Sequence, residues 1–259
     1  MSSNIFNIDK EDMLKDLTGK GVKIGIIDSG IEASHDVFKG SDAVKGGVVI
    51  EYENDEVVLK DYKGFDQYGH GTACAGIIHS IAKDAELYSI QVLGNKLSGQ
   101  VDVFLKGLEW AIENKMDIIN LSLGTTNKTY ISNFYTLLDR AYYENRTLIA
   151  AANNDPIPSI PSILSPVIAV EAIESDDQYE FYYRYSNCIE FLARGIYIKV
   201  PWINNSYMMM IGNSFAAPHI SGIVALLKEK NKNLTPFEIK SILKNISSQK
   251  EENNNQING

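Results

Sequence analysis

The sequence predicts an α/β protein in which helices cover both faces of a mostly parallel central sheet. Short apolar runs alternate with segments whose apolar residues recur at helical spacing, the pattern of strands joined by crossover helices. The apolar runs are almost uninterrupted, as burial on both faces of a parallel sheet requires. No linker or repeat divides the chain. We therefore expect one domain over residues 21–248, with an N-terminal extension (1–20) and a disordered tail (249–259).

The strands are predicted from the apolar runs themselves. The run VKIGIID (22–28) ends abruptly on a carboxylate, and residues 47–60 are expected to form a hairpin that turns near Asn54-Asp55. Further strands are expected over 86–93, 117–123, 147–152 and 166–173. The aromatic-rich segment 178–191 is expected to form strands with tyrosines on a partly exposed face.

The helices are predicted from apolar periodicity and from capping residues. The first is expected over 9–19, with Asp9 as its cap and Gly19 at its end. The last opens at Thr235-Pro236-Phe237-Glu238, where threonine is the cap, proline occupies the first turn and glutamate bonds back to the cap. The helices between them are expected over 69–80, 101–115, 131–146 and 214–230, the last with Pro218 in its first turn.

Composition and charge exclude several classes of protein. Of the 259 residues, 44% are hydrophobic and the formal net charge is −9, so basic patches for nucleic acid or an anionic membrane are not expected. No apolar run approaches the roughly 20 residues of a membrane-spanning helix, and the N-terminus has no apolar signal-peptide core. Two cysteines are too few for a disulfide scaffold, and we expect Cys74 and Cys188 to be reduced in a cytoplasmic protein.

Three polar residues stand where chemistry is expected in such a fold. Asp28 ends the first strand, His70 lies between two glycines, and Ser214 begins a helix whose free N–H groups suit an oxyanion. Taken alone, each has a structural explanation as a turn or capping residue. Together they supply an acid, a base and a nucleophile in one of the recurring triad orders, with Asn154 available as an electrophile. The other histidines are expected to be structural: His35, His79 and His219.

Three segments hold these residues among distinctive neighbours: IGIIDSGIEASH, GHGTACAG and GNSFAAPHISG. They resemble, in this order, the aspartate, histidine and serine motifs of the subtilisin-like serine proteases, or subtilases. The segment LSGQVDVFLKGLEWAIENKMDIINLSLG resembles the family's helix and substrate-binding strand, and AAANND the segment with its oxyanion asparagine. The resemblance covers residues 20–230 or so and implies the subtilisin fold and serine endopeptidase activity without a cofactor or metal at the catalytic site.

The resemblance implies a role for each matched residue. Ser214 would attack the peptide carbonyl, His70 would take its proton and pass it to the leaving amine, and Asp28 would orient and stabilise the imidazolium. The side-chain amide of Asn154 would hold the oxyanion together with the Ser214 backbone N–H. The substrate would be an extended peptide that adds a strand to three residues of this chain: Ser122, Leu123 and Gly124.

Several positions depart from the family's usual residues. Asn213 stands in place of threonine, Phe215 in place of methionine and Asn153 in place of glycine. None removes a catalytic group, but Phe215 and Asn153 are bulkier and are expected to reshape the site. Val37 stands where many relatives have a calcium-binding aspartate, and the calcium-binding insert of the histidine helix is missing, so we expect no calcium site there.

The segment DPIPSIPSILSP is expected to form one wall of the pocket for the residue before the scissile bond. Ser159 would lie near the floor of this pocket and Asp155 at its rim. A carboxylate at the rim would favour a basic side chain, whereas a solvated Asp155 would have no effect. The net charge of −9 also suggests a basic or neutral peptide as the substrate.

Several biological roles are compatible with these residues. The first catalytic strand begins at residue 22, which suggests either a trimmed chain or folding without a large prodomain. The second alternative resembles intracellular subtilisins and cytoplasmic leader-peptide proteases. The missing calcium loop favours leader-peptide removal over general protein turnover. A peptide ligase would use the same acyl-enzyme, but no water-excluding insert is visible, and a non-catalytic peptide-binding protein should have lost a triad member. The sequence leaves the oligomeric state open.

Overall fold

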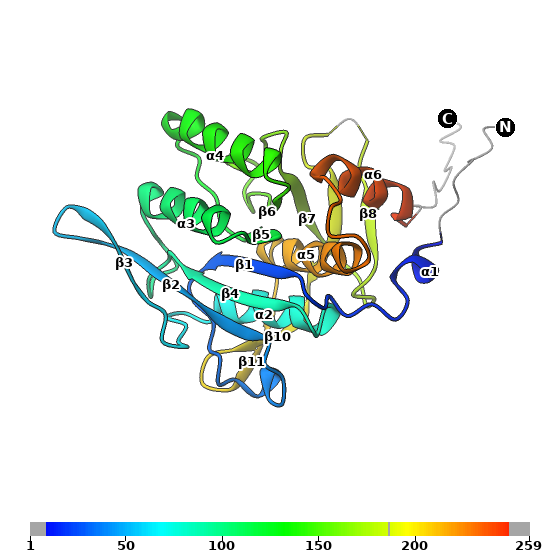
Figure 1. Cartoon of the computed structure of the whole chain (residues 1–259), viewed down its shortest axis with the longest axis horizontal. Helices are drawn as coiled ribbons and strands as arrows, with labels where there is room; N and C mark the ends of the chain where they lie inside the picture. The colour runs from blue at the N-terminus through cyan, green and yellow to red at the C-terminus, as the bar shows by residue number, and fades with distance from the viewer. Residues whose placement is uncertain (1–8, 186, 249–259) are drawn as a thin grey trace, which may run out of the picture.

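The computed structural model describes residues 9–185 and 187–248, and its centre is a nine-stranded sheet (Figure 1). The order across the sheet is β3-β2-β4-β1-β5-β6-β7-β9-β8, parallel from β2 to β9 and with an antiparallel strand at each edge. The strands are β1 (Lys23–Asp28), β2 (Val44–Glu53), β3 (Glu56–Asp61), β4 (Glu86–Gln91), β5 (Ile118–Leu121), β6 (Thr147–Ala151), β7 (Ile168–Glu174), β8 (Phe181–Tyr183) and β9 (Phe191–Ile196). The predicted fold class is confirmed.

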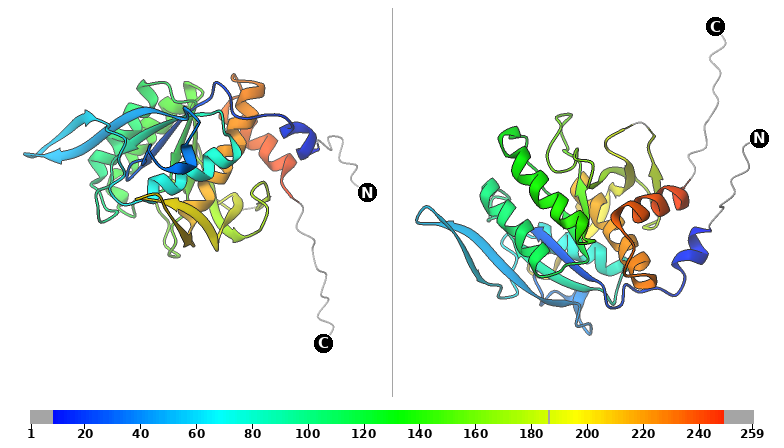
Figure 2. Two further views of the ribbon diagram at one scale, coloured as in Figure 1. Left: turned by 90° about the horizontal axis from the view of Figure 1, so that it is seen from below. Right: turned by 45° about the horizontal axis from the view of Figure 1, so that its top comes forward.

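Helices cover both faces of this sheet and bury an apolar core on each (Figure 2). One face packs against α2 (His70–Ile81), α5 (Asn213–Lys230) and α6 (Pro236–Ile246), and the other against α3 (Val101–Glu113) and α4 (Ile131–Tyr143). Neighbouring residues of one strand belong to different cores: in β1, Ile26 packs on the α5 side and Ile27 on the α3 side. Burial on both sides explains why the strand sequences are continuous apolar runs.

Two local predictions are confirmed in detail. β2 and β3 form the expected hairpin, which projects beyond the body of the protein and turns at Asn54 and Asp55, both in the left-handed region (φ 49° and 64°) (Figure 1). α6 begins with the expected capping box, in which Glu238 N donates to Thr235 Oγ1 (3.2 Å) and Thr235 N donates to Glu238 Oε2 (2.8 Å). Local capping and turn chemistry therefore determined these two boundaries.

The N-terminal helix is shorter than predicted. α1 covers Lys10–Leu14 rather than 9–19, although Asp9 caps it as predicted, with Oδ1 accepting from Glu11 N (2.8 Å). Beyond it the backbone N–H groups of Thr18 and Gly19 donate to Glu229 Oε2 (2.6 and 2.7 Å), so this segment is tied to α5 instead of continuing as a helix. Tertiary hydrogen bonds here replace the helical ones that the sequence pattern predicts.

The two ends of the described chain lie close together. Lys10 Nζ donates to Ser248 Oγ (3.5 Å), next to the end of α6. Residues 1–8 and the predicted tail (249–259) lie outside the described residues. Within the described ranges, no helix combines the length and the apolar character that crossing a membrane requires.

A second, two-stranded sheet is not predicted by the sequence pattern. It consists of β10 (Ile198–Trp202) and β11 (Ser206–Met210), and it packs Ile198 and Val200 against α2. Its strands escape prediction because Pro201 interrupts β10 and most of the apolar residues of β11 are exposed. In the aromatic-rich segment, strand structure ahead of β9 is confined to β8.

Pro218 lies inside α5 rather than in its first turn, which corrects the prediction. α5 begins at Asn213, so Pro218 cannot donate the helical hydrogen bond to the carbonyl oxygen of Ser214. Two side chains donate to this oxygen instead: Ser122 Oγ at 2.8 Å and Cys74 Sγ at 3.5 Å. Because Pro218 leaves the Ser214 carbonyl oxygen without its helical donor, that oxygen can bond to side chains from α2 and from the residue that follows β5.

Acid is expected to destabilise the fold through His219. This residue is 4% exposed within α5, and burial lowers its pKa from 6.5 to about 4. Because the unfolded chain then binds a proton at higher pH than the folded chain, the free energy of unfolding should fall by about 3 kcal/mol as pH drops through this window. Urea unfolding at pH 7 and pH 4 measures the fall. His219→Gln should lose less stability on acidification than the wild type, and an equal loss would argue against this cause.

Candidate active site

The polar residues singled out from the sequence gather where the strand order of the sheet reverses. β1 lies in the middle of the sheet, with β4 and β2 on one side of it and β5, β6 and β7 on the other. Ligands of such sheets bind at this switch point, beyond the carboxyl ends of the strands. Asp28 is the last residue of β1, and Ser122 and Asn154 follow β5 and β6 at the same edge.

Asp28 and His70 form a buried hydrogen-bonded pair. His70 Nδ1 lies 2.8 Å from Asp28 Oδ1 and 2.9 Å from Oδ2, and the two residues are 5% (His70) and 0% (Asp28) exposed. The Ser29 N–H donates to Asp28 Oδ1 (2.7 Å), which fixes the orientation of the carboxylate. Because the neutral imidazole donates its proton from Nδ1 to the carboxylate, Nε2 is left free to accept one.

The backbone around His70 allows α2 to approach β1 closely. His70 is the first residue of α2 and follows Gly69, whose φ of 115° favours glycine. A Cβ at Gly69 would overlap the Trp202 ring, and one at Gly71 would overlap the carbonyl oxygen of Gly30. The glycines on both sides of the histidine therefore permit contacts that larger residues would prevent.

Asp66 connects the residues on either side of the Asp28–His70 pair. Its Oδ1 accepts hydrogen bonds from Ser29 Oγ and Gly69 N (both 2.8 Å), and its Oδ2 accepts from Thr72 N (2.8 Å) and Thr72 Oγ1 (2.6 Å). One carboxylate thus joins the end of β1 to both flanks of His70. Asp66 is not recognisable from the sequence, because an aspartate in the loop before a helix is typical of a turn or cap; its place four residues before the histidine is the only signal.

The environment of His70 determines its charge. Burial by itself would lower the pKa of His70, but the Asp28 carboxylate, assisted by Cys74 and by the hydrogen bond to Asp28, raises this pKa well above its ordinary value of 6.5. The same burial raises the pKa of the Cys74 thiol. His70 is therefore a stronger base than an exposed histidine, as proton abstraction from a hydroxyl requires.

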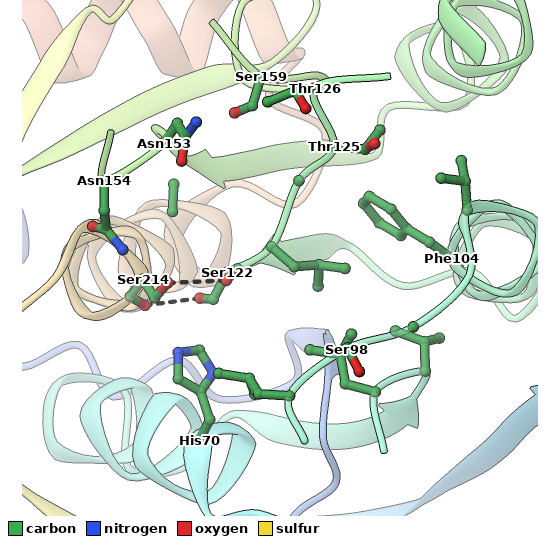
Figure 3. A pocket seen from close by; sticks show the side chains of 18 of the residues that line it. His70, Ser98, Phe104, Ser122, Thr125, Thr126, Asn153, Asn154, Ser159 and Ser214 are labelled. Atoms are coloured by element: carbon green, nitrogen blue, oxygen red, sulfur yellow. Dashed lines mark hydrogen bonds between the residues drawn. The ribbon is translucent and has the colours of Figure 1, made fainter. Parts of the chain in front are cut away.

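Ser214 faces His70 across the site from the second position of α5 (Figure 3). Its hydroxyl donates to the carbonyl oxygen of Ser122 (3.0 Å), and Ser122 Oγ donates back to the Ser214 carbonyl oxygen (2.8 Å). A hydroxyl has one proton to donate, so Ser214 must turn from Ser122 toward His70 before it can transfer that proton. Hydrogen bonds between catalytic groups often form only once the substrate is bound.

Asn154 lies beside Ser214 on the same side of the site (Figure 3). Its Oδ1 accepts a hydrogen bond from Asn213 N (2.9 Å), which leaves the Nδ2 group available as a donor. Because Ser214 is the second residue of α5, its backbone N–H has no acceptor within the helix. Two donors are thus available next to the Ser214 hydroxyl, an arrangement suited to a negatively charged oxygen.

A cleft of about 370 Å³ is lined by His70, Asn154 and Ser214. Four residues expected to bind substrate also line it: Ser122, Leu123, Gly124 and Ser159. Apolar side chains on its wall include Leu93, Leu97, Val101 and Phe104. Among the described residues that line the cleft, His70 alone is ionisable. The cleft can therefore hold an extended chain with apolar or neutral polar side chains.

Asp155 does not line this cleft, contrary to the expectation that it forms the rim. It is exposed and borders a second cavity of about 870 Å³, together with Asn153 and Asn154. Asn153 Nδ2 donates to the Ile157 carbonyl oxygen (2.9 Å), and this short turn holds Asp155 at the surface. Asp155 therefore does not contact the cleft, and a preference for basic side chains through this residue stays a prediction.

Two residues that the sequence singled out for their size or burial contact the triad. The Phe215 ring lies 5.2 Å from the His70 ring, measured between centroids. Cys74 is free and fully buried, and its Sγ lies 3.7 Å from Asp28 Oδ2 and 3.3 Å from Ser122 Oγ, whereas Cys188 is free and exposed. Burial of Cys74 was expected, but its contact with the Asp28–His70 pair was not, because sequence spacing does not show what lies across the helix.

Comparison with known proteins identifies the family. Residues 19–259 match the model of the subtilase family, Peptidase_S8. The chain belongs to the subtilase family. Like the three motifs, its fold agrees with this assignment: the crystal structure of a cold adapted subtilisin-like serine proteinase matches with a TM-score of 0.72 and 27% identity, over 88% of this chain and 83% of that one.

Curated relatives of this subtilase carry the names of proteases. It is 34% identical over 245 residues to the minor extracellular protease Epr of Bacillus subtilis (strain 168), an alignment that covers 89% of this chain and 36% of Epr. It is 30% identical over 243 residues to subtilisin Savinase of Lederbergia lenta, covering 90% of this chain and 85% of Savinase. The chain spans 60% of the M-protease of Shouchella clausii (strain KSM-K16), also at 30% identity. It thus matches well under two thirds of Epr and most of Savinase.

Proposed function

We propose that this subtilase is a serine endopeptidase that hydrolyses peptide bonds through an acyl-enzyme. The observation that carries the proposal is the meeting, at one cleft, of the buried Asp28–His70 pair, the Ser214 hydroxyl and the Asn154 amide. Relatives named as proteases support it.

In the proposed reaction, Ser214 first turns from Ser122 to His70. It gives its proton to Nε2 while its Oγ bonds to the substrate carbonyl carbon, and Asp28 stabilises the imidazolium. Asn154 Nδ2 and the Ser214 N–H donate to the oxyanion. His70 then passes the proton to the leaving nitrogen as the C–N bond breaks, which leaves an ester on Ser214. Water loses a proton to His70 and attacks this ester. As the ester C–O bond breaks, His70 returns that proton to Ser214 Oγ, which releases the acid and restores the serine and the neutral histidine.

The proposed substrate is an extended segment with apolar residues before the scissile bond. Ser122, Leu123 and Gly124 continue directly from β5, so a peptide can add to this edge as a strand. Leu93 and Phe104 supply apolar contacts along the same cleft. Within the described part of the chain, no acidic residue lines the cleft, which supports a neutral rather than a basic substrate.

Within this activity, we propose removal of a leader peptide from a precursor in the cytoplasm rather than general protein turnover. The apolar wall of the cleft supports it, because distinct side-chain contacts select a defined segment. Val37 stands in place of a calcium-binding aspartate, which also supports leader-peptide removal, because a chain without the calcium loop resembles the leader-peptide proteases. One relative is named as extracellular, so the location needs its own measurement, by fractionation of the source cells.

Cleavage of a peptide library, read by mass spectrometry, tests the substrate and the reaction together. We expect cuts at few positions, each preceded by apolar residues, and none with Ser214→Ala. Cleavage at many unrelated positions would favour turnover, and products joined to an added amine would favour a ligase. A requirement for lysine or arginine before the cut would reinstate Asp155 as a specificity residue. No cleavage by a folded sample would favour a peptide-binding protein.

Replacing Asn154 by alanine is expected to lower kcat by about 10²–10³ with little change in KM, because the lost donor acts on charge that develops in the transition state. Initial rates over a range of peptide concentrations separate the two constants. Asn133→Ala is the matched control, since Asn133 is an exposed asparagine on α4 that does not line the cleft. Equal losses for the two variants would contradict the assigned role.

The rate is expected to rise with pH through the titration of His70. A general base must be neutral, and the pKa of His70 is raised above 6.5, so the acid midpoint of kcat/KM should lie above pH 6.5. A pH–rate profile with an uncharged peptide measures it. A midpoint at or below pH 6.5 would contradict the influence of Asp28 on the histidine.

A further inference from the structure

Asn213 occupies an unusual position for a buried amide. It is the first residue of α5, it directly precedes Ser214, and it is 8% exposed. A polar side chain at this depth requires hydrogen-bond partners to offset its loss of water. The bonds it makes therefore indicate what this part of the molecule holds in place.

All the hydrogen-bonding groups of Asn213 that face inward are used. Its Oδ1 accepts from Ala172 N in β7 (2.8 Å), and its Nδ2 donates to the carbonyl oxygens of Asn153 (2.9 Å) and Ala152 (3.3 Å). Its backbone N–H donates to Asn154 Oδ1 (2.9 Å). Asn213 is thus hydrogen-bonded to β7 and to the three consecutive residues 152–154.

Two other hydrogen bonds hold this segment: Ala152 N donates to the carbonyl oxygen of Val170 in β7 (2.8 Å), and Asn153 Nδ2 donates to that of Ile157 (2.9 Å). Neither bond involves Asn154. The segment follows the end of β6 and has no regular structure from residue 153 to residue 159, and Asn154 itself is exposed. The direction of Asn154 Nδ2 depends on the backbone beneath it and on what holds Oδ1. Asn213 provides both, because its side chain fixes the backbone and its N–H fixes the oxygen.

We propose that Asn213 is a positioning residue for the oxyanion site: it holds the 152–154 segment so that Asn154 Nδ2 points to the carbonyl oxygen attacked by Ser214. The proposal rests on the proposed endopeptidase function and adds to it a residue that touches neither substrate nor the reacting atoms. An amide offers one acceptor and two donors on a planar group, so it can bond to β7 and to two carbonyl groups at once. A threonine hydroxyl, with one proton, cannot make all three bonds.

A double-mutant cycle between Asn213 and Asn154 tests the proposal. Asn213→Ala should lower kcat about 10- to 100-fold at nearly constant KM, because misplacement of a donor affects the transition state more than binding. In an Asn154→Ala background, the same change should lower kcat no further, since the amide that it positions is already gone. Losses that multiply in the double variant would overturn the proposal, as would an unchanged kcat in a less stable Asn213→Ala protein.

Asn120 supplies a matched control for the cycle. It is a fully buried asparagine whose Nδ2 donates to Ser122 Oγ (3.0 Å), so it supports the opposite side of the cleft. Any loss caused by Asn120→Ala should multiply with that of Asn154→Ala. If Asn213→Ala fails to fold, Asn213→Asp serves instead, because it retains the acceptor for β7 and lacks the two donors. A wild-type protein without turnover would overturn the proposed function itself, whereas a multiplicative cycle with active wild type would overturn only the role of Asn213.

Discussion

Replacing Ser214 by alanine is expected to lower kcat by about 10⁶, to the level left by binding and the oxyanion donors alone. The Ser214 hydroxyl faces His70 across the cleft, and without it the proposed acyl-enzyme cannot form. The variant should remain folded, because the lost side chain makes one hydrogen bond, to the Ser122 carbonyl oxygen. Peptide cleavage followed over hours by mass spectrometry covers the range of rates needed.

The control for this variant is Ser132→Ala, which removes an exposed hydroxyl on α4 and should leave the rate unchanged. Circular dichroism and a thermal melt of each variant establish that the fold is intact. Residual cleavage by Ser214→Ala at a few per cent of the wild-type rate would mean that another group is the nucleophile, and the proposed mechanism would fail.

Replacing Asp28 by asparagine is expected to lower kcat by about 10⁴ while preserving the shape of the site. The Ser29 N–H donates to Oδ1, so an asparagine would keep its oxygen there and present its NH₂ group to His70 Nδ1. The imidazole would then have to carry its proton on Nε2, the nitrogen that must accept the proton of Ser214. Loss of the carboxylate also removes the charge that raises the pKa of His70, so the acid midpoint should move to lower pH.

Two measurements separate this tautomer effect from general damage. NMR of ¹⁵N-labelled histidine should show the Nδ1 proton of His70 in the wild type and its transfer to Nε2 in the variant. Asp139→Asn, an exposed change on α4, should leave both the spectrum and the rate as in the wild type. An Asp28→Asn protein with wild-type tautomer and undiminished kcat would show that Asp28 only supports the fold.

The sequence predicted the parts of the fold in which local chemistry and burial agree. Strand β1 is recognisable because Ile26 and Ile27 pack on opposite faces of the sheet, which requires a continuous apolar run. The capping box at Thr235 fixed the start of α6 for a similarly local reason. The prediction failed for β11, whose exposed methionines form no period, and for the first helix, where a tertiary contact to Glu229 ends the helical pattern early.

For the site, the sequence identified the residues that carry the chemistry but not the contacts that orient them. The order of the motifs predicted that Asp28, His70 and Ser214 form one triad. In the structure, Asp28 bonds to His70, and His70 faces Ser214 across one cleft. The hydrogen bonds of Asp66 and Asn213 join segments far apart in the chain, and sequence spacing carries no record of them. At Asn213, the only sign of such a role in the sequence is that an asparagine stands in place of the family's usual threonine.

Reaction with a serine-directed fluorophosphonate tests the central claim most directly, because the probe requires a serine activated by a neighbouring base and an oxyanion site, and needs no knowledge of the natural substrate. The folded wild-type protein should be labelled at a single residue, identified by peptide mass spectrometry as Ser214. The Ser214→Ala and His70→Ala proteins should not react. A folded wild-type sample that stays unlabelled, or a label on any other residue, would contradict the proposal that this cleft is a serine protease active site.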